Sequence, residues 1–100
     1  MQWEETTSLC AGLQGILYDG GRVVGFLVNQ GMHEYAVRVR AALLNFGTYP
    51  IPETAYHIAM GMEHFGNGLM QDGEMIAGDF CHQIADNVRE FFMLNPHQKN

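Results

Sequence analysis

Residues Asp72 to Leu94, DGEMIAGDFCHQIADNVREFFML, carry the longest helical pattern in this 100-residue chain. Apolar side chains recur at the spacing of an α-helix, so they gather on one side of it while polar side chains gather on the other. We therefore predict a long amphipathic C-terminal helix that forms the spine of the core. Phe80 and Ile84 should lie deepest in that core. The expected buried side holds Ile76, Ala77, Phe80, Cys81, Ile84, Val88 and Phe91.

The residues at both ends of this stretch indicate where the helix begins and ends. Asp72 is a suitable N-cap, and Glu74 places a negative charge near the positive end of the helix dipole. Asn95-Pro96 prevents continuation beyond Leu94, because proline lacks an N–H group and restricts the residue before it. Residues 96–100 are expected to form a flexible polar tail.

The composition indicates one small globular domain over residues 1–100, because 47 % of the residues are apolar and 11 % are aromatic. No apolar run approaches the roughly 20 residues of a membrane span, and the start MQWEETTSLC has no basic segment like that of a signal peptide. We therefore expect a cytoplasmic protein without a membrane segment. Cys10 and Cys81 are expected to be small buried side chains rather than a disulfide pair.

The charge balance favours a protein partner over a nucleic acid. Eleven acidic residues stand against five basic ones, which gives a formal charge of −6. A phosphate backbone is bound by clustered lysines and arginines, and this chain has one lysine, Lys99, in the tail. Direct nucleic-acid binding is therefore disfavoured, and an acidic protein suits a partner with a basic surface.

Two helical segments are expected before residue 30. Residues 3–17 have helical spacing, Asp19-Gly20-Gly21 indicates a break, and residues 22–28 form an apolar run. That run is either a short buried helix or a strand that pairs with residues 13–18 as a β-hairpin. The helix is favoured, because an isolated two-stranded hairpin is only marginally stable and no third strand follows.

Two further helices are expected between residues 33 and 66. Residues 33–46 end at Gly47, a suitable C-terminal cap, and Pro52 suits the first turn of a helix that runs to about Gly66. Residues 66–73 should then form a flexible connection to the last helix. The predicted fold is all-α, a single small domain of four to five helices. The alternative is an α+β fold with a short N-terminal β-hairpin.

The first candidate site is a polar stripe on the helix that begins at Pro52. It holds Glu53, His57, Met60 and His64, and histidine with methionine could suit a soft ion such as Cu(I). His57 and His64 are two turns apart, about 10 Å, so they cannot both bind one metal ion from a straight helix. We interpret the stripe as a solvent-facing or partner-facing surface with weak metal candidates at His57, Met60 and His64.

The second candidate site is the outer face of the C-terminal helix, where Asp79, His82 and Asp86 are spaced by three and four residues. Two carboxylates beside a histidine could hold a divalent ion, with Glu63 as the nearest acidic residue on another helix. The alternative is a charged surface on which Asp86 pairs with Arg89 and His82. We favour this charged surface, with Glu90 as a further member, as a partner-binding face.

These patterns predict a non-enzymatic acidic binding protein that occupies a macromolecular partner, as an adaptor, an antitoxin-like antagonist or a phage-type inhibitor does. No motif for a catalytic serine, a reactive cysteine or a phosphate-binding loop occurs, and no cofactor is expected. The alternatives are a homo-oligomer that binds a small ligand or metal, and a metal-dependent hydrolase that uses Asp79, His82 and Asp86. A homodimer or higher oligomer is also expected, because 100 residues offer little interior for so many apolar groups. The interface candidates are Trp3, Phe26, Phe46, Phe92 and Met93.

Overall fold

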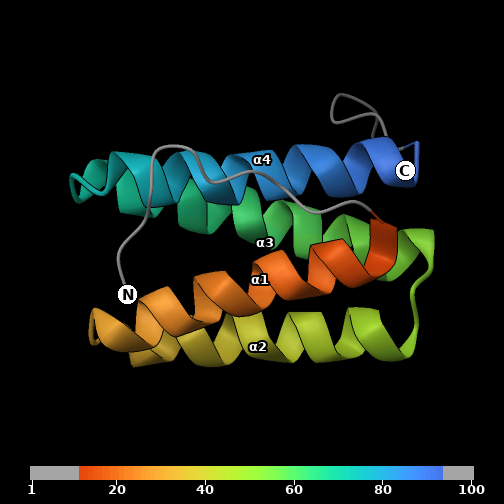
Figure 1. Ribbon diagram of the computed structural model, residues 1–100, viewed down its shortest axis with the longest axis horizontal. Helices are drawn as coiled ribbons and strands as arrows, with labels where there is room; N and C mark the ends of the chain where they lie inside the picture. Colours follow the sequence, from red (N-terminus) through yellow and green to blue (C-terminus); the bar gives the residue numbers. More distant parts are fainter. Residues whose placement is uncertain (1–11, 94–100) are drawn as a thin grey trace.

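The computed structural model describes residues 12–93 of the chain, and this range holds four α-helices and no strand. The helices are α1 (Gly12–Asn29), α2 (His33–Thr48), α3 (Pro52–Gln71) and α4 (Met75–Phe91). Successive helices run in opposite directions and are joined by short turns at the ends of the molecule (Figure 1). The α1 helix packs against α2 and α4, and α3 packs against the same two neighbours. This is an antiparallel four-helix bundle, and it confirms an all-α fold of four to five helices for the described range.

The α1 helix passes without interruption through Asp19-Gly20-Gly21, where the sequence predicted a break. A Cβ atom on Gly20 would lie 2.4 Å from Cδ2 of Leu43 in α2. The absence of a side chain therefore lets Leu43 pack directly on the α1 backbone, which offsets the helix-propensity cost of about 1 kcal/mol per glycine. The predicted break is wrong, and the β-hairpin alternative is not supported because residues 13–28 all lie in one helix. The predicted residues 3–11 of the first helix lie outside the described range.

The α3 helix also continues through Gly66-Asn67-Gly68, where the sequence predicted a flexible loop, and it ends only at Gln71. The connection to α4 is therefore three residues long. Asp72 is the C-cap of α3 and not the N-cap of α4, a position that Glu74 takes. The predicted helix start at Asp72 is wrong. Asp72 belongs to the end of α3, which stops at the following residue, Gly73, whose φ is +89°.

At Gly73, α3 ends with two backbone hydrogen bonds to carbonyl groups of its last turn. The N–H groups of Gly73 and Glu74 donate to the carbonyls of Met70 and Leu69 at 3.0 and 2.9 Å. This pair of bonds around a glycine with positive φ is a Schellman motif.

The end of α1 repeats this motif at Gly31, whose φ is +77°. The N–H groups of Gly31 and Met32 donate to the carbonyls of Val28 and Leu27 at 3.0 and 2.8 Å. Because α1 and α3 run in the same direction, both motifs lie at the same end of the bundle (Figure 1).

The α4 helix is amphipathic, but it is neither the longest element nor a spine that the other helices cover. It has 17 residues, whereas α3 has 20, and its backbone does not approach α2 on the opposite corner of the bundle. Phe80 and Ile84 are buried, as predicted. Ile76 and Phe91, which were expected on the buried side, are 45 % and 49 % exposed. They are the second and the last residue of α4.

The hydrophobic core lies between the four helices, and all of them contribute to it. Cys81 is a fully buried free thiol, as predicted, whereas Cys10 lies outside the described residues. None of the helices in residues 12–93 combines the length and apolar character needed to cross a membrane. The largest fully buried side chains of the described range include Phe46, Ile16, Leu27, Ile58, Met62, Leu69 and Ile84.

The α3 and α4 helices form the most extensive contact in the bundle, and two glycines face each other within it. A Cβ atom on Gly66 would lie 2.8 Å from the backbone oxygen of Gly78, and one on Gly78 would lie 2.7 Å from the backbone oxygen of Gly66. Small side chains continue the contact along α4, at Cys81 and Ala85, both fully buried. The two backbones therefore touch, and any side chain at either glycine would force the helices apart.

We expect Gly78→Ala to lower the free energy of unfolding. The added methyl group would overlap the backbone of α3, which costs about 1–3 kcal/mol and exceeds the helix-propensity gain of about 1 kcal/mol. Gly68→Ala is the matched control, because a Cβ at this exposed position of α3 meets no atom within 4 Å. It should stabilise the protein by up to about 1 kcal/mol. Urea denaturation of the two variants checks the prediction, and equal stabilisation by both would contradict it.

Candidate functional site

The outer face of α4 carries a stripe of acidic side chains that we call the acidic stripe, formed by Asp79, Asp86 and Glu90. All three are exposed, on the side of the helix opposite the core. Gln83 lies within the stripe and donates a hydrogen bond from Nε2 to Oδ2 of Asp79 at 2.5 Å. These side chains share one face of α4 because they are separated by whole turns of the helix, as the sequence predicted.

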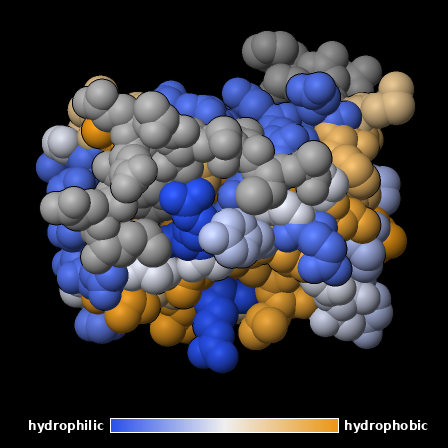
Figure 2. All heavy atoms as spheres, in the orientation of Figure 1, coloured by the Kyte–Doolittle hydropathy of each residue, from blue (hydrophilic) through white to orange (hydrophobic). Residues whose placement is uncertain are grey.

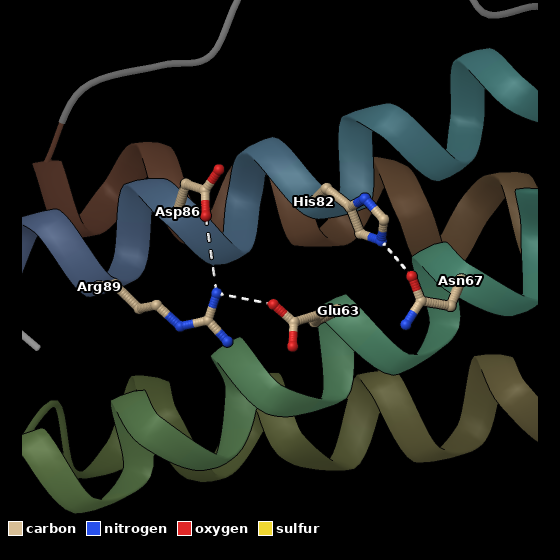
Figure 3. A network of polar contacts seen from close by, with 5 residues as sticks. All are labelled: Glu63, Asn67, His82, Asp86 and Arg89. Atoms are coloured by element: carbon tan, nitrogen blue, oxygen red, sulfur yellow. Dashed lines mark hydrogen bonds and ion pairs between the residues drawn. The ribbon is translucent and has the colours of Figure 1, made fainter. Parts of the chain in front are cut away.

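His82 turns away from the acidic stripe towards α3. Its Nε2 lies 2.8 Å from Oδ1 of Asn67, and because this carbonyl oxygen accepts, the ring nitrogen donates (Figure 3). The ring packs where α3 has no side chain, since a Cβ atom on Gly66 would lie 2.5 Å from Cδ2 of His82. Asp79 pairs with Gln83 and Asp86 pairs with Arg89. Asp79, His82 and Asp86, which the sequence suggested as one cluster, therefore each contact a different residue.

Arg89 joins the acidic stripe to α3. Its Nη1 lies 3.0 Å from Oε1 of Glu63 and 3.6 Å from Oδ1 of Asp86 (Figure 3). Only 9 % of Arg89 is exposed, whereas the side chains of Glu63 and Asp86 are 52 % and 78 % exposed. The buried guanidinium thus fixes two carboxylates at the surface. The sequence predicted that Arg89 pairs with Asp86. It did not predict the contact of Arg89 with Glu63 or that of His82 with Asn67, because Glu63 and Asn67 lie on α3, far from α4 in the sequence.

The predicted stripe on α3 is exposed along its whole length, at Glu53, His57, Met60 and His64. The ring of His57 lies edge-on to that of Tyr56, with the centroids 6.2 Å apart, and the ring of His64 lies edge-on to that of Phe65, 5.8 Å apart. These residues do not converge on one point. Within residues 12–93, no three His, Cys, Asp or Glu side chains come close enough to hold a metal ion together.

Burial raises the pKa of the Cys81 thiol from its ordinary value of 9.0 to about 12. Removal from water disfavours the charged thiolate, which is the nucleophilic form of cysteine. In the folded protein Cys81 therefore stays protonated, and its role is to fill the narrow contact between α3 and α4.

A cavity of about 340 Å³ opens at the end of the bundle where the two Schellman motifs lie. We call it the end pocket, and no sequence motif pointed to it. The signal that could have located it is the pair Gly31 and Gly73, which place the C-termini of two parallel helices at the same end. Its lining includes Leu27, Met32, Tyr35, Phe65, Leu69 and Asp72.

A shallower and more apolar groove of about 470 Å³ lies between α1 and α2 on the outside of the bundle. We call it the α1–α2 groove. Gly21 and Gly47 keep it open, Leu44 stands exposed beside it, and Arg40 is its charged residue. Apolar residues gather over this part of the molecule in the space-filling view, along the lower edge where α2 lies (Figure 2). Its members are Leu17, Gly21, Val24, Arg40, Leu43, Leu44, Gly47 and Thr48.

The aromatic residues expected at an interface do not form this groove. Phe26 and Phe46 are buried in the core, so their prediction as surface groups is wrong. Phe92 packs edge-on against Phe46 with the ring centroids 5.7 Å apart, and Met93 is exposed. Trp3 lies outside the described residues. The helical spacing alone did not distinguish an aromatic side chain that is buried in the core from one that stays exposed at the surface.

Charge is divided unequally between the two halves of the bundle. Residues 52–93, which form α3 and α4, hold seven acidic residues and one arginine, a formal charge of −6. Residues 12–51, which form α1 and α2, hold two acidic residues and three arginines, a formal charge of +1. One of these arginines, Arg22, stacks over the Phe80 ring at 5.2 Å from its centroid. The acidic character of the described range is therefore carried by α3 and α4.

Comparisons with protein-family models, curated proteins and solved structures find no significant match for this chain.

We expect Glu63 and Arg89 to be energetically coupled. Glu63 is half exposed, so solvent screening limits the interaction, and a coupling of about 1 kcal/mol is expected. A double-mutant cycle with Glu63→Gln, Arg89→Gln and the double variant in urea denaturation measures it. Asp86→Asn in place of Glu63→Gln should give a smaller coupling, because its contact is longer and more exposed. A coupling of zero for Glu63 would contradict the inferred anchoring.

Proposed function

We propose that this protein is a non-enzymatic binding protein whose acidic α3–α4 half occupies a basic surface of another protein. The observation that carries the proposal is the charge of −6 on residues 52–93 against +1 on residues 12–51. A one-sided charge distribution steers a partner of opposite charge and orients it during encounter. The expected contact residues are Asp79, His82, Asp86 and Glu90 on α4 and Glu53, His57 and His64 on α3.

The rigidity of this half supports the proposal. The backbone contact of Gly66 with Gly78 fixes the two helices relative to each other, and Arg89 holds Glu63 and Asp86 in place. Carboxylates that are already oriented lose less conformational entropy when they bind than mobile side chains do. A basic partner would therefore meet a preorganised acidic face.

We also propose that the protein self-associates through the α1–α2 groove. Two copies that met through their α3–α4 halves would bring like charges together, which costs free energy. The α1–α2 half has almost no net charge and carries the apolar groove with exposed Leu44. A two-fold dimer built on this face would leave both acidic faces turned outward and free for partners.

We expect neutralisation of the acidic stripe to abolish capture of the partner, whereas the same charge change elsewhere should not. The stripe variant is Asp79→Asn with Glu90→Gln. The control, Glu34→Gln with Glu74→Gln, changes the net charge equally at residues outside the stripe. Each protein serves as bait for affinity purification from the native host, followed by mass spectrometry.

With the captured partner in hand, association rates at several salt concentrations complete this test. Each single neutralisation in the stripe should slow association and weaken its salt dependence, because exposed charges act mainly on encounter. Equal losses in the stripe variant and the control would show that net charge matters rather than this face, and would contradict the proposal.

Self-association is tested by sedimentation at tens of micromolar protein. We expect a dimer of the 11.2 kDa chain. Leu44→Lys should convert it to a monomer, because an ammonium group in the apolar groove beside Arg40 would be desolvated next to a like charge. Met60→Lys, a similar change at an exposed position of α3, should remain dimeric. A wild-type protein that sediments as a monomer would refute this part of the proposal.

A further inference from the structure

The end pocket is built from two helix C-termini, the first turn of a third helix and a single carboxylate. The ends of α1 and α3 contribute Leu27 and Leu69, both fully buried, while Tyr35 comes from the start of α2. Its volume of about 340 Å³ falls within the range of small-molecule sites, towards the lower end. The lining is mixed, because His64, Asn67, Gln71 and Asp72 stand beside the apolar and aromatic residues.

Two aromatic side chains form part of the wall. The rings of Tyr35 and Phe65 meet edge to face, with the centroids 5.2 Å apart and an angle of 74° between the planes. The pair fixes both rings between α2 and α3. The face of an aromatic ring carries partial negative charge and attracts a cation within about 6 Å of the centroid.

The electrostatic environment of the pocket is negative. A helix C-terminus carries partial negative charge, and two of them, those of α1 and α3, meet here. Neither helix has a basic residue in its last turn, and the pocket lining contains one histidine, His64, and no lysine or arginine. Asp72 adds a full negative charge at the C-cap of α3, where a basic residue would suit the helix dipole better.

The start of α2 partly opposes this field. A helix N-terminus carries partial positive charge, and His33 begins α2 at the same end of the bundle. Glu34 lies in the first turn and offsets that charge, although it also pairs with Arg38 at 4.0 Å. The lining contains no residue of α4. Among the described residues, Asp72 is therefore the one carboxylate of the lining, and the two helix C-termini add partial negative charge to it.

From these features we propose that the end pocket binds an organic ammonium group. The aromatic pair and Met32 would contact its carbon atoms, and Asp72 with the two helix C-termini would neutralise its charge. The same chemistry is offered by a free quaternary amine and by a lysine side chain of another protein. The pocket shares His64 with the proposed contact residues, but its lining contains no residue of the acidic stripe on α4. Loss of ammonium binding and loss of capture by the stripe can therefore be distinguished.

The test uses choline as the free cation, a short acetylated and amidated Gly-Lys-Gly peptide as the lysine source, and 3,3-dimethyl-1-butanol as the neutral analogue of choline. Each is titrated into the full-length protein and followed by amide chemical shifts in two-dimensional NMR. Choline, the peptide or both should shift the signals of Tyr35, Phe65 and Asp72. The neutral analogue should bind at least about tenfold more weakly, because it lacks the charge while keeping the shape.

Two variants with the same net charge separate the pocket from general electrostatics. Asp72→Asn should weaken cation binding by about tenfold or more, whereas Asp79→Asn on the outer face of α4 should leave it unchanged. Tyr35→Leu should weaken it as well, because it removes one aromatic ring from the wall while keeping an apolar side chain. Asp72 and Asp79 are both exposed, and thermal melts confirm that each variant is folded.

Binding by choline, by the peptide or by both, with loss in Asp72→Asn, supports the proposal and identifies the source of the ammonium group. Three results would overturn it: no response to either cation at millimolar concentration, equal affinity for the neutral analogue, or equal weakening by Asp72→Asn and Asp79→Asn. None of the three bears on partner capture by the acidic stripe, so the two proposals fail separately.

Discussion

The backbone contact between Gly66 and Gly78 is the constraint on which the rest of this bundle depends. A Cβ atom at either position would meet the other helix at less than 3 Å, so the separation of α3 and α4 is set by the absence of side chains. At that separation a histidine on α4 reaches an asparagine on α3, and Arg89 reaches Glu63. The polar contacts across the seam are therefore consequences of the glycine pair, and they fix the orientation of the acidic face.

Close packing at a glycine also occurs between α1 and α2, but the surface beside it is apolar rather than acidic. Leu43 packs over Gly20, and the small residues Gly21 and Gly47 remain at the outside, where they leave the α1–α2 groove open. In the α3–α4 pair the space above the close contact is filled by charged and polar side chains. In the α1–α2 pair it is lined by apolar ones. Close helix packing at glycine therefore accompanies an acidic face in the α3–α4 half and an apolar groove in the α1–α2 half.

The sequence correctly predicted the features that depend on the helical spacing of residues within one helix. It failed at several glycines, because a glycine can either end a helix or let two helices pack closely. The helical spacing correctly located α2, the start of α3 at Pro52 and the burial of Phe80 and Ile84. It also placed the acidic stripe on an exposed face. Glycine at 20, 21, 66 and 68 was interpreted as a breaker, yet the helices continue, because two of these glycines serve close packing that only the folded chain shows. The contacts of His82 and Glu63, and the end pocket, join residues far apart in sequence, so no local pattern could predict them.

The division of charge also constrains how the surfaces can be used together. Two acidic faces repel each other over roughly a Debye length, about 8 Å at physiological salt, so contact between copies through α3 and α4 is disfavoured. Contact through the nearly neutral α1–α2 half carries no such penalty, and its apolar character would make it depend little on salt. Binding of a basic partner, as proposed, would depend strongly on salt, because exposed charges are screened. The proposed self-association and partner binding would therefore respond to different physical variables. A two-fold dimer would present two identical acidic faces, and their combined binding would exceed that of one face wherever a partner offers two basic sites within reach.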